Sequence, residues 1–158
     1  MRTSFFMGLA WLAASACAGD AAVRPSQALP LYAQECGACH TAYAPALLSA
    51  ASWSRIMGGL GRHYGSDASL EPAQIQTIGR WLQAEAATGR KRGTAPPEDR
   101  ITRADWFVHE HRKVPAQVWQ LASVKSASQC GACHTRADEG RFQERELRAP
   151  VGMKGRFE

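Results

Sequence analysis

Residues 36–40 read Cys36-Gly37-Ala38-Cys39-His40, and the same five residues return at 130–134 as Cys130-Gly131-Ala132-Cys133-His134. Two cysteines three positions apart, followed directly by histidine, form the attachment signature of c-type haem. Each thiol can form a thioether to one vinyl group of the haem, and the adjoining histidine then lies under the iron as an axial ligand. The repeat therefore predicts two covalently bound haem c groups. The predicted attachment residues are Cys36, Cys39, Cys130 and Cys133, and the predicted axial ligands are His40 and His134.

Two other interpretations of paired cysteines explain less of the pattern. A four-cysteine zinc site usually has its second cysteine pair closer to the first than these two pairs are. A thioredoxin-like redox pair needs a βαβ setting, and the sequence has no strand-like alternation of apolar and polar residues. Neither alternative explains a histidine after both pairs.

The first 20 residues have the pattern of a signal peptide. Arg2 provides a basic start, and the apolar run from Phe5 to Ala14 is too short to span a bilayer. Small residues follow, with cleavage sites available at Ala14-Ser15-Ala16 or Ala16-Cys17-Ala18. An N-terminal membrane anchor is the alternative, and lipidation of Cys17 is a further one, although the residues before it make a poor lipobox. We expect export to the periplasm.

The charge of the chain argues against nucleic acid as a partner. The formal net charge of the 158 residues is +5 at pH 7. The propionate groups of two haems would nearly cancel this charge, so the basic isoelectric point does not indicate a polyanion-binding surface. Beyond the first 20 residues, no stretch has the apolar length of a membrane-spanning helix.

The apolar spacing predicts helices in the first half of the chain. A short helix is expected from Leu31 into the first motif, and another from an N-cap at Ser52, with Trp53, Ile56, Met57 and Leu60 on one face. His63 continues that apolar stripe. A further helix is expected over about residues 70–87, ended by Gly89, with its buried face made by Ile75, Ile78, Leu82 and Ala86.

The second half has fewer signals, and all of them are helical. Thr102 resembles the first residue of a capping box, and Pro115 can begin a helix that leads to the second motif. We therefore predict an all-α protein with two small cytochrome c-like domains, each packed around a covalent haem. The predicted segments are a signal peptide at 1–20, an N-terminal haem domain at 21–90, a linker at 91–100 and a C-terminal haem domain at 101–158.

The remaining histidines are candidates for the second axial position of each iron. His63 lies on an apolar stripe, where an imidazole needs a buried partner. His111 shares a helical face with Phe107 and Val114, whereas His109 shares its face with charged residues and cannot face the same haem as His111. We predict His63 and His111 as distal iron ligands. Met57 is expected in the core, and Met153 is the rival ligand in a loop.

Several stretches then resemble a known family, the dihaem cytochromes c that act with the oxygen-binding monohaem protein called sphaeroides haem protein. The likeness holds in order and spacing from about Cys36 to Pro150. The matching stretches are Ala44-Pro45-Ala46-Leu47-Leu48, Ser52-Trp53, Ile56-Met57, His63-Tyr64-Gly65-Ser66-Asp67, Arg100-Ile101-Thr102, Trp106-Phe107, Glu110-His111-Arg112, the second haem motif, Gly140-Arg141-Phe142 and Ala149-Pro150. Family members typically have Phe at the position of Tyr64 and a different basic residue at the position of His109.

The resemblance implies a periplasmic electron carrier with two low-potential haems, each held by two histidines. It implies a membrane cytochrome b-type donor and a soluble haem protein, like sphaeroides haem protein, as the acceptor. Six-coordinate irons offer no open site, so we expect no enzymatic activity. The alternatives are a small dihaem enzyme, such as a peroxidase or small-ligand reductase with one open iron, and an electron-entry module of a larger oxidoreductase. The spacing leaves open which distal histidine serves which haem.

Overall fold

The computed structural model describes residues 30–89 and 94–153, and every regular element within these ranges is helical. The predicted all-α class is confirmed for this part of the chain, where β-pairing is limited to isolated bridges. The predicted signal peptide and Cys17 lie outside the described residues. The α-helices are α1 (Pro30–Cys36), α2 (Ala50–Gly58), α3 (Pro72–Ala84) and α5 (Asp105–Glu110). The 3-10 helices are η1 (Pro45–Leu47), η2 (Leu60–Arg62), η3 (Pro97–Asp99), η4 (Ile101–Arg103), η5 (Ala116–Gln120), η6 (Cys130–Ala132), η7 (Ala137–Glu139) and η8 (Glu144–Glu146).

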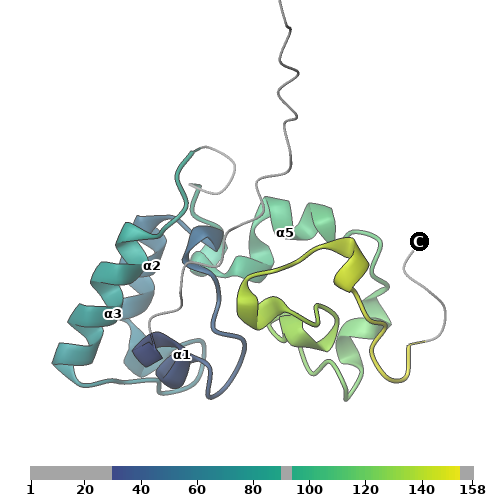
Figure 1. Cartoon of the computed structure of the whole chain (residues 1–158), viewed down its shortest axis with the longest axis horizontal. Coiled ribbons are helices and arrows are strands. Elements are labelled where there is room, and N and C mark those ends of the chain that lie inside the picture. The colour runs from purple at the N-terminus through teal and green to yellow at the C-terminus, as the bar shows by residue number, and fades with distance from the viewer. Residues whose placement is uncertain (1–29, 90–93, 154–158) are drawn as a thin grey trace, which may run out of the picture.

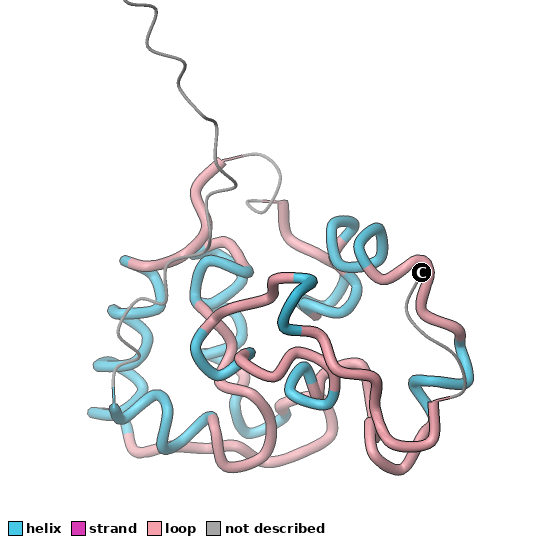
Figure 2. The backbone as a smooth tube through the Cα atoms, turned by 45° about the vertical axis from the view of Figure 1, so that its right-hand side comes forward, coloured by secondary structure: helices cyan, strands magenta, loops and turns pink. Residues whose placement is uncertain are grey.

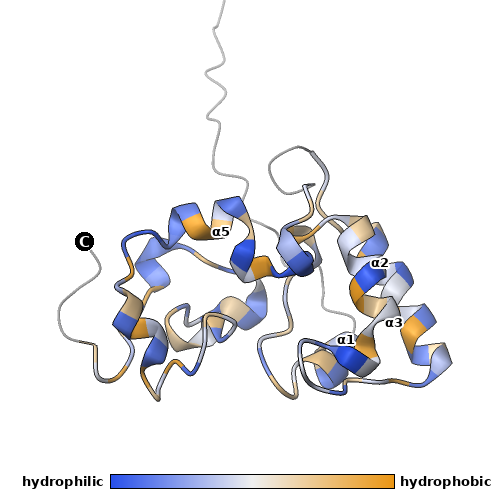
Figure 3. Cartoon of the chain, turned by 180° about the vertical axis from the view of Figure 1, so that it is seen from behind, coloured by the Kyte–Doolittle hydropathy of each residue, from blue (hydrophilic) through white to orange (hydrophobic). Residues whose placement is uncertain are grey.

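The two halves of the chain lie side by side (Figure 1). The first half contains α1, α2 and α3. The second half contains α5, and most of its other elements are short 3-10 helices joined by loops (Figure 2). Apolar and hydrophilic residues alternate along the helices, as expected when only one face of each is buried (Figure 3). Within the described ranges, no helix has both the length and the apolarity that crossing a membrane requires.

The packing of α2 against α3 forms the main apolar core of the first half. Ile78 and Leu82 of α3 are fully buried, and Trp53 and Met57 of α2 are nearly so. The indole Nε1 of Trp53 donates to the carbonyl oxygen of Pro45 at 2.7 Å, which satisfies the polar atom of this buried ring. The apolar spacing thus predicted the buried faces correctly, and Met57 lies in the core as expected.

The predicted N-cap of α2 is wrong by three residues. Ser49 is the cap, because its Oγ accepts from the backbone N–H of Ser52 at 3.2 Å, and the helix begins at Ala50. Ser52 lies in the first turn with its side chain buried. Two serines three residues apart offer equivalent capping side chains, so the sequence alone did not separate them.

The end of α2 also differs from the prediction, and the difference places His63. The helix stops at Gly58, and η2 follows, so His63 lies at the end of a 3-10 turn and not on a continuous α-helical stripe. Glycine weakens a helix because of its backbone freedom, and residues 58, 59 and 61 are all glycine. Tyr64 and Gly65 then adopt positive φ angles of 53° and 99°, which turn the chain sharply after His63.

Helix α3 is shorter than the predicted 70–87. Pro72 occupies its first turn, and Gln74 Oε1 accepts from the backbone N–H of Glu71 at 3.0 Å, as in a capping box. The helix ends at Ala84, five residues before the positive-φ Gly89 that was expected to terminate it.

The second half contains less α-helix than predicted. Thr102 lies within η4, and α5 begins at Asp105 after Ala104, so the predicted capping box at Thr102 is wrong. Pro115 precedes a 3-10 helix, η5, instead of an α-helix. Runs of 3-10 structure are short because their hydrogen bonds are poorer, so this half depends on side-chain packing more than on helical length.

The segment that joins the halves is described from residue 94 and packs closely on α2. Asp99 accepts two hydrogen bonds from the guanidinium of Arg55, at 2.7 and 2.8 Å. Ile101, Ala104 and Phe107 belong to the same buried cluster as the core of the first half. The two halves therefore share apolar contacts, and the predicted boundary at 91–100 stays a prediction.

We expect Leu82→Ala to lower the free energy of unfolding by roughly 2–5 kcal/mol, the usual cost of truncating a fully buried leucine. Denaturant unfolding of the haem-loaded protein measures this value. Gln83→Ala, at the exposed neighbouring position of α3, should change it by less than about 0.5 kcal/mol. Equal losses in the two variants would contradict the assignment of this core.

Candidate haem sites

The first haem motif begins at the C-terminus of α1. Cys36 is the last residue of the helix, and the backbone N–H of Gly37 donates to the carbonyl oxygen of Ala33 at 3.0 Å. A Cβ at position 37 would collide with that oxygen, so the motif needs glycine here. Cys39 is exposed, and His40 follows it directly.

The second motif has a different local structure. Cys130, Gly131 and Ala132 form η6, and the backbone N–H of His134 donates to the carbonyl oxygen of Cys130 at 2.8 Å. A Cβ at Gly131 would meet nothing within 4 Å, so steric crowding does not explain glycine at this position. The same five residues therefore occur at the end of an α-helix in one half and in a 3-10 turn in the other.

Burial favours the protonated form of three attachment thiols, those of Cys36, Cys130 and Cys133. It raises the pKa of Cys36 and of Cys130 to about 11, and a nearby Glu35 raises the pKa of Cys36 further. Burial also raises the pKa of Cys133. None of these cysteines is joined to another in a disulfide. All four motif cysteines are therefore free to form thioethers.

In the first half, His40 faces His63. The two ring centres are 6.2 Å apart, and the ring planes are nearly parallel, at 21° to each other. His40 Nδ1 lies 2.7 Å from the carbonyl oxygen of Thr41. Because a carbonyl only accepts, Nδ1 carries the proton and the lone pair of Nε2 is free.

In the second half, His134 faces His111. Their ring centres are 6.0 Å apart, and the ring planes are closer to perpendicular, at 75°. His111 is the residue that ends α5, and its Nδ1 donates to the carbonyl oxygen of Phe107 at 2.8 Å. This bond again leaves Nε2 as the free lone pair. His134 Nδ1 is buried with no hydrogen-bond partner among the described residues.

Both separations fit one iron between two imidazoles. A metal–imidazole bond is about 2 Å long and the ring centre lies about 1 Å beyond the nitrogen, so two opposed imidazoles on one metal have centres about 6 Å apart. Burial lowers the pKa of His63, and the neighbouring His40 and Arg100 lower it further. Burial and the neighbouring His111 likewise lower the pKa of His134. Neutral imidazole is the form that binds metal.

Aromatic rings surround each histidine pair, as the flat apolar faces of a haem would require. The closest is Phe107, whose ring is near-parallel to that of His111 with centres 4.0 Å apart. Trp119 lies 5.7 Å from His111, and Phe142 lies 5.3 Å from His134. In the first half, Tyr43 lies 4.8 Å from His40 and Tyr64 lies 4.8 Å from His63. Of these five rings, only Phe107 was predicted to lie beside a histidine. Tyr43 and Tyr64 follow His40 and His63 closely in the sequence, and this proximity was the available signal for those two rings.

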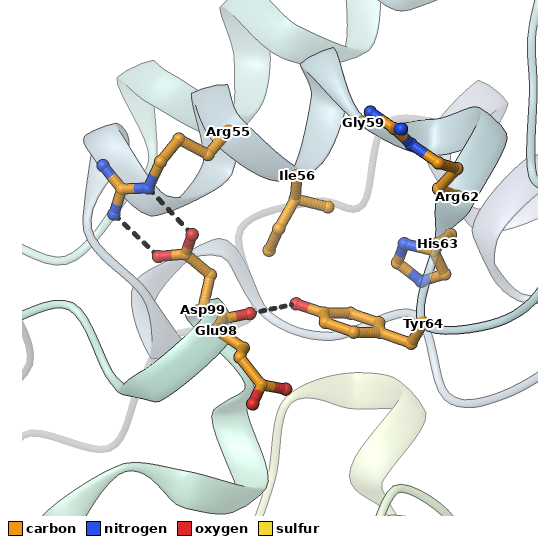
Figure 4. A pocket seen from close by; sticks show the side chains of 8 residues that line it. All are labelled: Arg55, Ile56, Gly59, Arg62, His63, Tyr64, Glu98 and Asp99. Carbon is orange, nitrogen blue, oxygen red and sulfur yellow. Dashed lines mark hydrogen bonds and ion pairs between the residues drawn. The ribbon is translucent and has the colours of Figure 1, made fainter.

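A cavity of about 150 Å³ lies beside His63 (Figure 4). Ile56 and Tyr64 provide apolar surface, and the paired Arg55 and Asp99 lie at one side of it. The hydroxyl of Tyr64 donates to the carbonyl oxygen of Glu98 at 3.0 Å, which fixes the turn after His63 to the segment joining the two halves. Arg100 lies over the Tyr64 ring, 4.2 Å from its centre.

The other candidates lie away from these pairs. His109 is exposed, and it does not meet His134 as His111 does. Met153 follows η8 in a turn near Pro150, and no described contact joins it to a histidine. No cluster of three or more His, Cys, Asp or Glu side chains suited to a metal occurs among the residues the structure describes. Haem iron needs only two such ligands, because the porphyrin supplies the rest.

A helical chain with two CxxCH motifs, in each of which the motif histidine faces a second histidine, has the architecture of a multihaem c-type cytochrome. The dihaem cytochrome c family matches residues 32–142, and this chain belongs to that family. It is therefore an electron-transfer haem protein, and the predicted cofactors, two covalently attached c-type haems, are confirmed by this membership.

Solved structures agree with the family assignment. The chain is similar to the dihaem cytochrome c of Shewanella baltica OS155, with 34% identity and a TM-score of 0.69 over 81% of this chain and 96% of that one. It is also similar to a structure of the dihaem cytochrome c of Rhodobacter sphaeroides, with 40% identity and a TM-score of 0.62 over 72% of this chain and 96% of that one. No curated protein matches the chain.

Replacing both cysteines of one motif should remove one haem and leave the other. We expect Cys36→Ala with Cys39→Ala, and separately Cys130→Ala with Cys133→Ala, to lower the mass of the denatured protein by one haem each. Mass spectrometry measures this directly. A mass that keeps both haems in either double variant would contradict the assignment of its motif.

Proposed function

We propose that this protein is a periplasmic electron carrier in which each haem iron is bound by two histidines. His40 and His63 would hold the first iron, and His134 and His111 the second. The single observation that carries this proposal is the separation of about 6 Å between the ring centres of each pair. A bound iron changes between its ferrous and ferric states, and that one-electron change is the chemistry the haem supplies.

The histidine pairs favour a carrier over an enzyme. With imidazole on both faces, an iron would have no open position for peroxide or another small ligand, so the protein would act by holding and tuning its haems. The carbonyl oxygens of Thr41 and Phe107 fix the orientation of His40 and His111 by accepting from their Nδ1 atoms. Ligands held in this way need little rearrangement when the iron changes charge.

The compartment and partners rest on the sequence. The signal-like first 20 residues support export, and attachment of haem to CxxCH motifs is compatible with the periplasm. The resemblance to dihaem cytochromes that act with sphaeroides haem protein supports a membrane cytochrome b-type donor and a soluble haem protein acceptor. The rival function is a small dihaem enzyme with one open iron.

Carbon monoxide distinguishes the carrier from the enzyme, because it binds ferrous haem only at an open axial position. We expect the reduced native protein to bind none. His63→Ala and His111→Ala should each bind about one equivalent, as measured from the carbon monoxide difference spectrum. The change in each variant follows from the loss of one imidazole ligand.

His109→Ala is the matched control, because His109 lies two residues before His111 and its side chain is exposed. It should bind no carbon monoxide. Rapid binding by the reduced native protein would instead support the enzyme. Binding by His109→Ala, with none by His111→Ala, would reverse the ligand assignment in the second half.

A further inference from the structure

Tyr43 contacts the first haem site and the loop that leads into the second haem motif. Its ring lies near-parallel to that of His40, at 23° and with centres 4.8 Å apart. Its hydroxyl donates to the carbonyl oxygen of Ser128 at 2.8 Å, across 85 residues of sequence. Ser128 lies two residues before Cys130, so one side chain joins the axial histidine of the first site to the loop that carries the second.

The contact continues to a haem attachment atom. The carbonyl oxygen of Ser128, which accepts from Tyr43, lies 3.9 Å from Sγ of Cys130. A second hydrogen bond joins the same two loops, from Gln129 Nε2 to the carbonyl oxygen of Cys39 at 3.3 Å. The loops of the two motifs are therefore in direct contact, although 90 residues separate Cys39 from Gln129.

The surroundings hold Tyr43 in one position. Its backbone carbonyl accepts from the hydroxyl of Tyr32 at 2.8 Å, and the Tyr32 ring is buried against Trp81. The ring is thus held from the backbone side by the core of the first half and from the hydroxyl side by the second half. A hydrogen bond that links two parts of a fold constrains their relative position best when its ends are held, and the Tyr43 end is held by the buried Tyr32.

We propose that Tyr43 is a positioning residue that sets the geometry between the two haems and thereby the rate at which an electron passes from one to the other. This inference rests on the proposed carrier function. In that step one iron is oxidised from ferrous to ferric while the other is reduced from ferric to ferrous, and no bond or proton changes. The transfer rate depends steeply on the distance and contacts between the two sites, which the Tyr43 hydroxyl holds constant.

The test is Tyr43→Phe in the full dihaem protein. This change keeps the ring beside His40 and removes only the hydrogen bond to Ser128. We expect the rate of electron exchange between the haems, measured by NMR of the half-reduced protein, to fall by more than about twofold, because the two attachment loops lose one of the two hydrogen bonds that join them and separate more often. Hydrogen exchange at the backbone amides of residues 126–132 should also become faster.

Ser123→Ala is the matched control. The exposed Ser123 hydroxyl also donates to a distant carbonyl oxygen, that of Val151 at 2.7 Å, but neither residue belongs to a histidine pair or to an attachment loop. Its electron exchange rate should stay within about twofold of the native rate, because both attachment loops keep their hydrogen bonds. Equal slowing in both variants would overturn the proposal, as would a native rate in Tyr43→Phe.

A further variant separates the ring from the hydroxyl. Tyr43→Leu removes both the contact with His40 and the bond to Ser128, and we expect it to slow exchange at least as much as Tyr43→Phe. The optical spectrum of the native protein tests the carrier function independently, because an open iron would show there whatever the exchange rate of the variants. A native exchange rate in Tyr43→Phe with both irons six-coordinate would refute only the role of Tyr43.

Discussion

The distance between paired imidazoles is the constraint on which the rest of this structure depends. Each CxxCH histidine faces a second histidine at about 6 Å, and the helices and turns are arranged to hold that spacing. In the first half, glycines end α2 early and a positive-φ turn follows His63. In the second half, His111 ends α5 and is held by its bond to the carbonyl of Phe107. Different backbones thus produce the same separation.

The order of the motifs along the chain explains how the halves meet. The first motif precedes its partner histidine and the second follows its own, so both partner histidines lie in the middle of the sequence. The attachment loops come from opposite ends of the described chain, yet they touch through Tyr43 and Gln129. Shared burial of Ile101 and Phe107 with the first-half core adds apolar contact between the halves. Such an arrangement brings the two attachment loops into contact without a large interior.

Much of this could be predicted from the sequence, because the signals were chemical or periodic. The CxxCH repeat identified the cofactor, and the apolar spacing around Trp53 and Leu82 identified the buried faces. The pairing of His63 with His40 could not be read from spacing, because it depends on a turn that three glycines make possible. The role of Tyr43 was also hidden, because its partner Ser128 is far away in sequence. Most of the second half escaped prediction because 3-10 turns have little periodicity.

Low-temperature electron paramagnetic resonance of the fully oxidised protein tests the central claim, that each iron lies between two imidazoles, most directly. Near-parallel imidazole planes, at 21° in the first site, split the two iron d orbitals of π symmetry, whereas planes at 75° leave them nearly equal in energy. The account predicts two low-spin signals of equal intensity, one rhombic and one strongly anisotropic with a large maximum g-value. A high-spin signal from either iron would contradict it.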